Sequence, residues 1–268
     1  MSEDRDIIDE DLFEDIDEEE MYELLQQAKK EIEAKQQEGK PKRPFPKWAF
    51  WLISFAMFLQ VIALLPQTLS IPAIDFLTTS AKLSKQEIIQ SHKQAVVVIE
   101  TDESRGTGFS ITEDGKIITN AHVVKSNERV TVAFPEHGLF MADVIVSYPD
   151  IDLAVLQVEK GSALPTLELA EETLFVEGEQ IQFIGNPLRF QGIANEGSIL
   201  GYTKLRDWKE PVLMIQAPVY RGNSGSPIFN KAGQVIGVIF ATLDHESYGK
   251  VGLFIPIDYY YKKIKEGV

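Results

Sequence analysis

Short apolar runs separated by turn residues fill the C-terminal two thirds of the chain, and they constrain its fold more than any other feature. Asp114-Gly115 and Ala232-Gly233 have the composition of hairpin turns, and no long helical periodicity intervenes before Tyr259–Lys265. Runs of this length are typical of strands. With a polar break near 160–175, about twelve strands predict an all-β protein of two six-stranded antiparallel barrels. The apolar runs are residues 96–99, 109–111, 117–119, 130–134, 144–146, 153–158, 181–184, 212–215, 235–240 and 251–255.

Composition excludes several classes of function. The 268 residues include no cysteine, which rules out disulfide scaffolds, thiolate metal sites and cysteine nucleophiles. The formal net charge of −15 argues against a nucleic-acid partner, because few bases are available to neutralise phosphates. No metal-binding or phosphate-loop motif is found, so we expect neither a metal nor another cofactor.

The charge is concentrated in the N-terminal tail, residues 1–47. Residues 1–38 carry a net charge of −12, and the acidic run Asp4–Glu20 favours disorder. A helical spacing follows, which indicates either a helix that binds a cytoplasmic partner or a solvated, partly helical spacer. The residues with this spacing are Met21, Leu24, Leu25, Ala28 and Ile32.

Residues 48–66 contain no charged side chain. As a helix they would extend about 28 Å, close to the thickness of the membrane hydrocarbon. Four bases precede the segment within residues 40–47, which predicts a single-pass signal-anchor with a cytoplasmic N-terminus and an extracytoplasmic C-terminal part. A cleaved signal peptide would have a much shorter leader, and a buried core helix would not explain the flanking charge. Residues 67–91 are predicted to form a tether.

Three short motifs carry residues suited to acyl transfer. They are Gly106–Val124, which contains His122; Asp150-Ile-Asp152-Leu; and Gly222-Asn-Ser224-Gly. A serine nucleophile needs an imidazole to accept its proton, and a carboxylate that orients the imidazole. Glycines beside the serine let the chain turn tightly enough to aim backbone N–H groups at an oxyanion.

The motifs GTGF, TNAHVV, DLAVL and GNSGSP resemble those of trypsin-like serine proteases of the chymotrypsin fold, most closely the bacterial HtrA/Deg branch. The resemblance covers about residues 92–260, and we expect a protease domain at 92–262 with barrels at about 92–160 and 175–258. It implies that Ser224 is the nucleophile, His122 the general base and acid, and Asp152 the orienting carboxylate, with Asp150 as the alternative acid. It also implies an oxyanion hole formed by the N–H groups of Gly222 and Ser224, and a structural role for Gly185-Asn186-Pro187.

Two segments are expected to line the specificity pocket. Phe240 would narrow it in favour of small aliphatic side chains, and the lack of an acid shortly before Ser224 predicts little cleavage after Lys or Arg. Ser226 replaces a glycine that is usual in the branch. The expected lining residues are Pro218, Val219, Tyr220, Arg221, Val238, Ile239, Phe240 and Ala241.

The sequence thus predicts a membrane-anchored serine endopeptidase that cleaves exported or misfolded proteins without ATP. Protein quality control and a dedicated signalling role are not separable at this stage. The alternative is a pseudoprotease, a barrel-fold module that binds or senses peptides without cutting them. PDZ domains, usual after the protease in this branch, have no counterpart beyond Ile257, so we expect none; a homo-oligomer is left open.

Overall fold

The computed structural model describes residues 18–37, 46–68, 71–159, 161–206 and 208–266. The chain forms two compact units, Met1–Leu65 and Pro66–Val268, and each is described by itself. The acidic run that was expected to be disordered lies almost entirely outside the described residues. The bases Lys40, Lys42 and Arg43 also lie outside them.

Helix α1 (Glu18–Gln37) spans the segment in which helical spacing was predicted. Its apolar side chains face solvent, since Met21 is 50% and Ile32 55% exposed. No described residue of the first unit covers this face, and the choice between a partner-binding helix and a spacer therefore remains a prediction.

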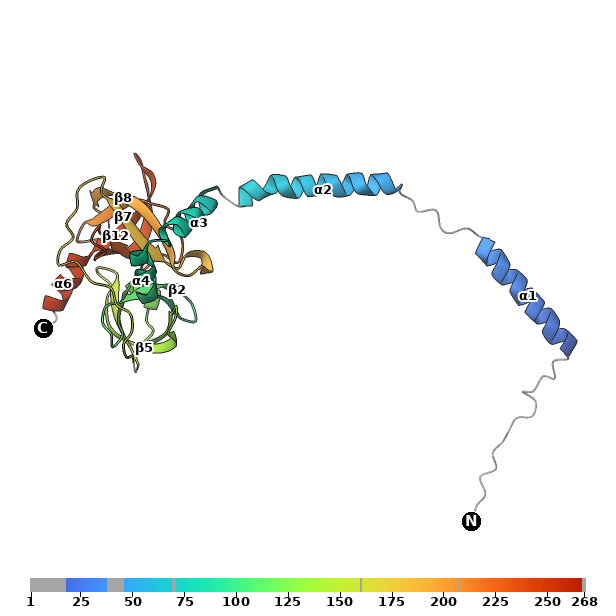
Figure 1. Cartoon of the computed structure of the whole chain (residues 1–268), viewed down its shortest axis with the longest axis horizontal. Helices are drawn as coiled ribbons and strands as arrows, with labels where there is room; N and C mark the ends of the chain where they lie inside the picture. Colours follow the sequence, from blue (N-terminus) through green and yellow to red (C-terminus); the bar gives the residue numbers. More distant parts are fainter. Residues whose placement is uncertain (1–17, 38–45, 69–70, 160, 207, 267–268) are drawn as a thin grey trace, which may run out of the picture. The chain divides into compact units, whose positions relative to one another are not determined.

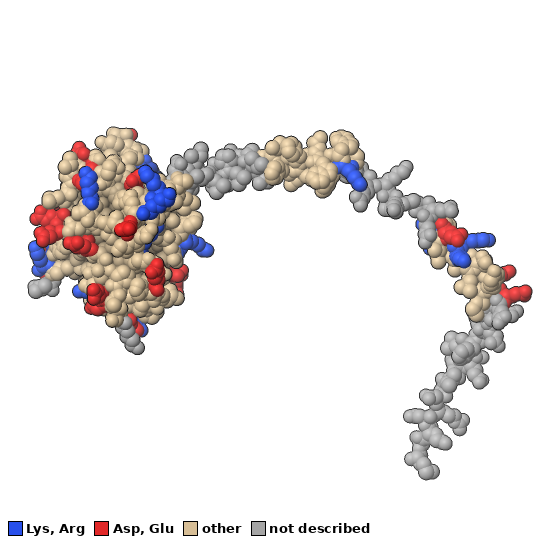
Figure 2. Space-filling model, in the orientation of Figure 1, with Lys and Arg blue, Asp and Glu red and all other residues tan. Residues whose placement is uncertain are grey.

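Helix α2 (Lys47–Thr68) covers the uncharged segment, and the face of its described part seen in Figure 2 is tan apart from a blue basic side chain at one end. Within the described residues, however, no helix is both long enough and apolar enough to cross a membrane. The structure thus gives no support to the predicted transmembrane helix.

Twelve strands in the described part of the second unit form two closed six-stranded barrels (Figure 1). All pairings within the barrels are antiparallel, as predicted, and closure leaves no strand edge unpaired. The first barrel has the order β1-β2-β3-β6-β5-β4 and the second β10-β11-β12-β9-β8-β7. The strands are β1 (Val96–Glu100), β2 (Arg105–Ser110), β3 (Lys116–Thr119), β4 (Arg129–Phe134), β5 (Gly138–Tyr148), β6 (Leu153–Val158), β7 (Gln180–Gly185), β8 (Ile193–Thr203), β9 (Val212–Gln216), β10 (Pro227–Phe229), β11 (Val235–His245) and β12 (Gly249–Pro256).

Many strands are buried on both faces, which explains why the sequence shows continuous apolar runs and not alternation. In β1, Val97 and Ile99 point into the core of the first barrel, whereas Val96 joins a separate cluster that both barrels share. In β11, Val238 belongs to the shared cluster and Ile239 to the core of the second barrel. This shared core holds the two barrels together, so that residues from each can form one site.

The segment predicted as a tether, residues 67–91, instead contains α3 (Ile71–Leu83) and most of α4 (Glu87–Ala95). Phe76, Ser80 and Leu83 are buried at helical spacing, at 3%, 5% and 1% exposure. The Ser80 hydroxyl accepts a hydrogen bond from the N–H of Ala194 in β8, at 3.1 Å. A helical face with a serine at its centre has too few apolar residues to stand out in the sequence, which is why the helix was missed.

Candidate active site

The first barrel brings His122 and Asp152 together. His122 lies in α5 (Ala121–Val124), a single helical turn that follows β3, and Asp152 directly precedes β6, the neighbour of β3. Asp152 Oδ2 lies 2.7 Å from Nδ1 of His122, and its Oδ1 accepts the backbone N–H of His122 at 2.9 Å. The carboxylate is 14% exposed and the imidazole 48% exposed. Both carboxylate oxygens therefore orient the imidazole, and its other nitrogen is left for a reacting group.

The backbone of Asp152 is held in an unusual conformation. Its φ of 50° lies in the left-handed region, which aspartate adopts more readily than most residues. Its carbonyl accepts hydrogen bonds from Asn120 Nδ2 at 2.9 Å and from the Ala121 N–H at 3.2 Å. The buried Asn120 thus ties the segment that carries the histidine to the residue that orients it.

Asp150, the alternative acid, is engaged elsewhere. Its Oδ2 lies 2.6 Å from Nζ of Lys263, in helix α6 (Ile257–Glu266), the helix predicted at the end of the chain. The hydrogen bond from this ammonium lowers the pKa of Asp150 below its ordinary value. The structure therefore brings Asp152, and not Asp150, to the histidine.

The second barrel contributes the turn that carries Ser224. Gly222 has a φ of 101° and Gly225 a φ of 87°, both in the region that favours glycine. A Cβ on Gly225 would lie 1.8 Å from the carbonyl oxygen of Thr107, and one on Gly222 would lie 2.6 Å from that of Asn186. Both glycines are thus required by conformation and by space.

Hydrogen bonds within and around this turn direct its N–H groups. The carbonyl of Arg221 accepts from the N–H of Leu188 at 3.0 Å, and that of Asn223 accepts from the N–H of Ser226 at 3.0 Å. A trans peptide unit holds its C=O and N–H on opposite sides, so the N–H groups of Gly222 and Ser224 point away from these partners. Among the described residues neither N–H has a backbone partner. Two such donors beside a serine hydroxyl can stabilise a developing oxyanion.

Thr107, in β2 of the first barrel, clamps the same turn from the other side. Its hydroxyl donates to the carbonyl of Gly222 at 2.7 Å and accepts the N–H of Asn186 at 2.9 Å. Its N–H donates to the carbonyl of Ser224 at 2.8 Å. The buried Asn186 also donates to the carbonyl of Val97 at 2.8 Å, in keeping with the structural role predicted for it. Both barrels therefore determine the shape of the turn.

The valine substitution Thr107→Val is expected to lower kcat by about 10- to 100-fold. Without the hydroxyl, the carbonyl of Gly222 loses its hydrogen bond, and the N–H groups of the turn are no longer held in the direction that stabilises an oxyanion. The matched control is Thr173→Val, whose hydroxyl likewise donates one buried hydrogen bond and accepts another, to Ile236 and from Ile257. Each variant should lose about 1–3 kcal/mol of stability. Steady-state kinetics with parallel thermal unfolding separates the two effects; equal kcat losses in both variants would contradict a specific role for Thr107.

The Ser224 hydroxyl donates to the carbonyl of Phe240 at 3.3 Å. Among the described residues it makes no direct hydrogen bond to His122. The two lie in the same neighbourhood, since a Cβ on Gly106 would lie 2.7 Å from Val123, next to the histidine, and 3.3 Å from the carbonyl oxygen of Ser224. Hydrogen bonds between catalytic groups are often incomplete before substrate binds. Rotation about χ1 of Ser224 is the movement that would direct its hydroxyl away from Phe240.

The residues expected to line a specificity pocket do not all do so. Val238 and Ile239 are completely buried in two different cores. Phe240 packs on Trp208, with ring centroids 4.6 Å apart, within the core shared by the barrels. Because its ring packs in this core, the Phe240 side chain is not available to narrow the specificity pocket. Val219 is also buried, whereas Pro218, Tyr220, Arg221 and Ala241 are partly or fully exposed.

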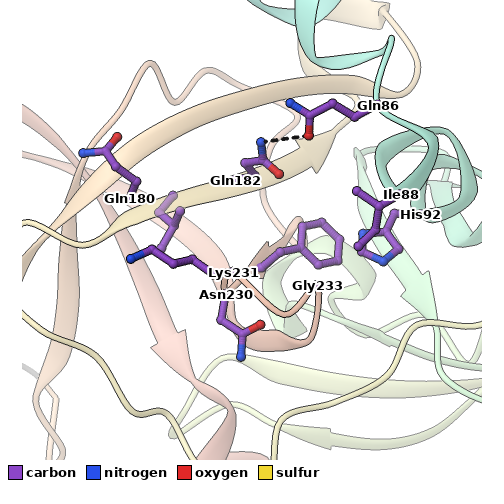
Figure 3. A pocket seen from close by; sticks show the side chains of 10 residues that line it. Gln86, Ile88, His92, Gln180, Gln182, Asn230, Lys231 and Gly233 are labelled. Atoms are coloured by element: carbon purple, nitrogen blue, oxygen red, sulfur yellow. Dashed lines mark hydrogen bonds between the residues drawn. The ribbon is translucent and has the colours of Figure 1, made fainter.

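A cavity of about 290 Å³ lies away from these residues, between α4 and strands β7 and β10 (Figure 3). Its wall includes His92, which stacks on Phe229 at 4.5 Å, and Gln86, which accepts a hydrogen bond from Gln182. Burial lowers the pKa of His92, so the neutral imidazole is favoured there. No residue of the three sequence motifs lines this cavity. Among the described residues, no cluster of His, Asp and Glu side chains could hold a metal ion.

The sequence of this chain is similar to those of known serine proteases. Residues 106–238 match the family described as a trypsin-like peptidase domain. The chain is 34% identical over 160 residues to a probable periplasmic serine endoprotease, DegP-like, from Pseudomonas putida, a match that covers 58% of this chain and 33% of the relative. It is 36% identical over 141 residues to human serine protease HTRA4, covering 50% of this chain and 29% of the relative. The chain thus spans about a third of the length of these curated relatives.

A solved structure gives the same result for the fold. The inactive form of the protease Rv3671c from M. tuberculosis aligns with a TM-score of 0.60 and 27% identity, over 69% of this chain and 94% of that one. The two barrels are therefore of the chymotrypsin-like type. Leu188 and Trp208 lie outside the sequence motifs. The sequence does not mark Leu188 because it acts through its backbone N–H, nor Trp208 because it acts through a ring contact with Phe240.

Proposed function

We propose that the chain is a serine endopeptidase that works through an acyl-enzyme, with Ser224 as nucleophile, His122 as general base and acid, and Asp152 as the orienting carboxylate. The observation that carries the proposal is the His122–Asp152 pair at 2.7 Å together with the N–H groups of Gly222 and Ser224 in the serine turn, which have no backbone partner among the described residues. This combination meets the requirements of acyl transfer.

The reaction would proceed in two halves. As Ser224 Oγ attacks the scissile carbonyl, its proton passes to Nε2 of His122, and the Gly222 and Ser224 N–H groups stabilise the oxyanion. The imidazolium then protonates the leaving amine, and the peptide bond breaks to leave an ester on Ser224. Water attacks this ester with the same imidazole as base, which releases the acid and restores the serine. Asp152 keeps the proton on Nδ1 throughout, so that Nε2 is free to accept.

Unfolded or exported proteins are the proposed substrates, cleaved without ATP. Support comes from the relatives in Pseudomonas, which are probable periplasmic serine endoproteases. Among the described residues no acidic side chain belongs to the turn at 217–225, which favours uncharged over basic side chains before the scissile bond. A peptide-library profile dominated by Lys or Arg would contradict this preference.

Treatment of the purified chain with a fluorophosphonate tests the enzyme assignment. We expect one adduct, located on Ser224 by tandem mass spectrometry and absent from heat-unfolded protein, together with cleavage of casein at the same protein concentration. Binding of casein without either adduct or cleavage would instead identify a pseudoprotease that senses or holds peptides.

We also propose an extracytoplasmic location with a membrane anchor at residues 48–66, on sequence grounds. The support is the absence of charge in this segment and the bases that precede it. Extraction of cell membranes with alkaline carbonate should leave the full chain in the pellet, and protease added to spheroplasts should digest the barrels but not the tail. Release into the supernatant would contradict the anchor.

A further inference from the structure

Helix α3 packs against the part of the second barrel that carries the catalytic turn. Phe76 is 3% exposed, and its ring meets that of Tyr220 in an edge-to-face contact, with centroids 5.0 Å apart and planes at 80°. Tyr220 begins the turn, since its carbonyl accepts the N–H of Asn223 at 3.0 Å. A side chain far away in the sequence therefore bears directly on the nucleophile turn.

The same helix also contacts β8, which follows the loop that packs against the turn. One helical turn after Phe76, the Ser80 hydroxyl accepts the N–H of Ala194 at the start of β8. β8 follows the loop 186–192, whose residue Leu188 donates its N–H to the carbonyl of Arg221. Because the peptide unit is trans, that hydrogen bond makes the Gly222 N–H point away from Leu188. Helix α3 thus supports both segments between which the Gly222 peptide unit is held.

We propose that α3 is a brace for the oxyanion hole, with Phe76 and Ser80 as positioning residues that act through Tyr220 and Ala194. The inference rests on the proposed hydrolase function, and it adds that undocking of the helix lowers turnover without loss of the barrel fold. Neither residue touches substrate. Control of the helix position, by anything bound to the segment that precedes it, would then control the rate of the chemical step.

The decisive variant is Phe76→Ala, with Leu83→Ala as the matched control. Leu83 lies on the same face of the same helix and is 1% exposed, but it packs in the core shared by the barrels. Below the unfolding midpoint of every variant, we expect Phe76→Ala to lower kcat about tenfold, less than the about 10²–10³-fold effect of removing an oxyanion donor. KM should stay within about threefold, because neither Phe76 nor Ser80 is among the residues expected to line the peptide-binding pocket. Leu83→Ala should reduce thermal stability at least as much, yet keep kcat within about twofold.

Two further variants keep the test decisive if Phe76→Ala fails to fold. Phe76→Leu retains apolar bulk and should recover most of the lost turnover, whereas Ser80→Ala should lower kcat in the same direction as Phe76→Ala. Loss of kcat in equal measure in Leu83→Ala, or wild-type kcat in both Phe76→Ala and Ser80→Ala, would overturn the proposal.

Amide hydrogen exchange provides a readout that does not depend on activity. Peptides covering 219–226 should exchange at least about fivefold faster in Phe76→Ala than in wild type or Leu83→Ala, because the N–H groups of Asn223, Gly225 and Ser226 are hydrogen-bonded in the docked state. Identical exchange in all three proteins would overturn the brace. A wild-type protein without fluorophosphonate labelling would instead contradict the proposed function, while the exchange result would still decide whether α3 orders the turn.

Discussion

Replacement Ser224→Ala is expected to reduce peptide hydrolysis by about 10⁵- to 10⁶-fold, because the groups of a triad act as a unit and loss of the nucleophile removes nearly all of their joint effect. The residue is only partly buried, and among the described residues its side chain makes one hydrogen bond, to the carbonyl of Phe240, so the stability should change by no more than about 1 kcal/mol. Single-turnover kinetics and denaturant unfolding on the same preparation measure both quantities.

Peptide binding provides the control for this variant. An unfolded peptide should bind Ser224→Ala about as well as the wild type, since the alanine alters no binding surface. If the variant kept more than about one thousandth of the wild-type turnover, the nucleophile would have to be another residue.

The Asp152→Asn variant is expected to lower kcat by about 10⁴-fold through the imidazole tautomer. Both oxygens of Asp152 accept hydrogen bonds from His122, one from the backbone N–H and one from the ring. Asparagine offers one oxygen and one NH₂ group. If the oxygen keeps the backbone contact, the NH₂ faces Nδ1 and favours the tautomer whose proton sits on Nε2, which cannot accept a proton from serine.

Asp150→Asn is the matched control, a carboxylate two residues away that is replaced in the same manner. It loses its ion pair with Lys263, at 2.6 Å on the protein surface, and such pairs contribute about 0–1 kcal/mol. Turnover should remain within about threefold of wild type. The reverse pattern, with Asp150→Asn inactive and Asp152→Asn active, would assign the orienting role to Asp150.

The strands that could be predicted from the sequence are those that contain consecutive apolar residues, most of which are buried. Ten of the strands contain one of the predicted apolar runs, and in several of them, such as β1, β6 and β11, the two faces pack in different cores. β8 was not among these runs, since it contains Asn195, Glu196, Gly197 and Ser198 and its position is set by pairing with β7 and β9. β10 is three residues long and begins with proline, which few sequence patterns would identify as a strand.

The site shows the same division between side chains and main chain. The residues of the motifs could be recognised because imidazole, carboxylate and hydroxyl groups belong to particular amino acids. The contacts that shape the turn involve the N–H of Leu188 and the carbonyls of Arg221 and Asn223, which any residue could supply. The contact between Phe76 and Tyr220 depends on where a helix docks, and the sequence around Phe76 does not display that.

The hydrogen bonds between Thr107 and the Ser224 turn have a consequence for the order in which the chain can assemble the site during synthesis. During translation the first barrel leaves the ribosome before the turn has been made, and the turn in isolation lacks the partner that shapes it. A chain still being synthesised therefore cannot assemble the proposed site until Ser224 and the strands that follow its turn, β10 to β12, have been added.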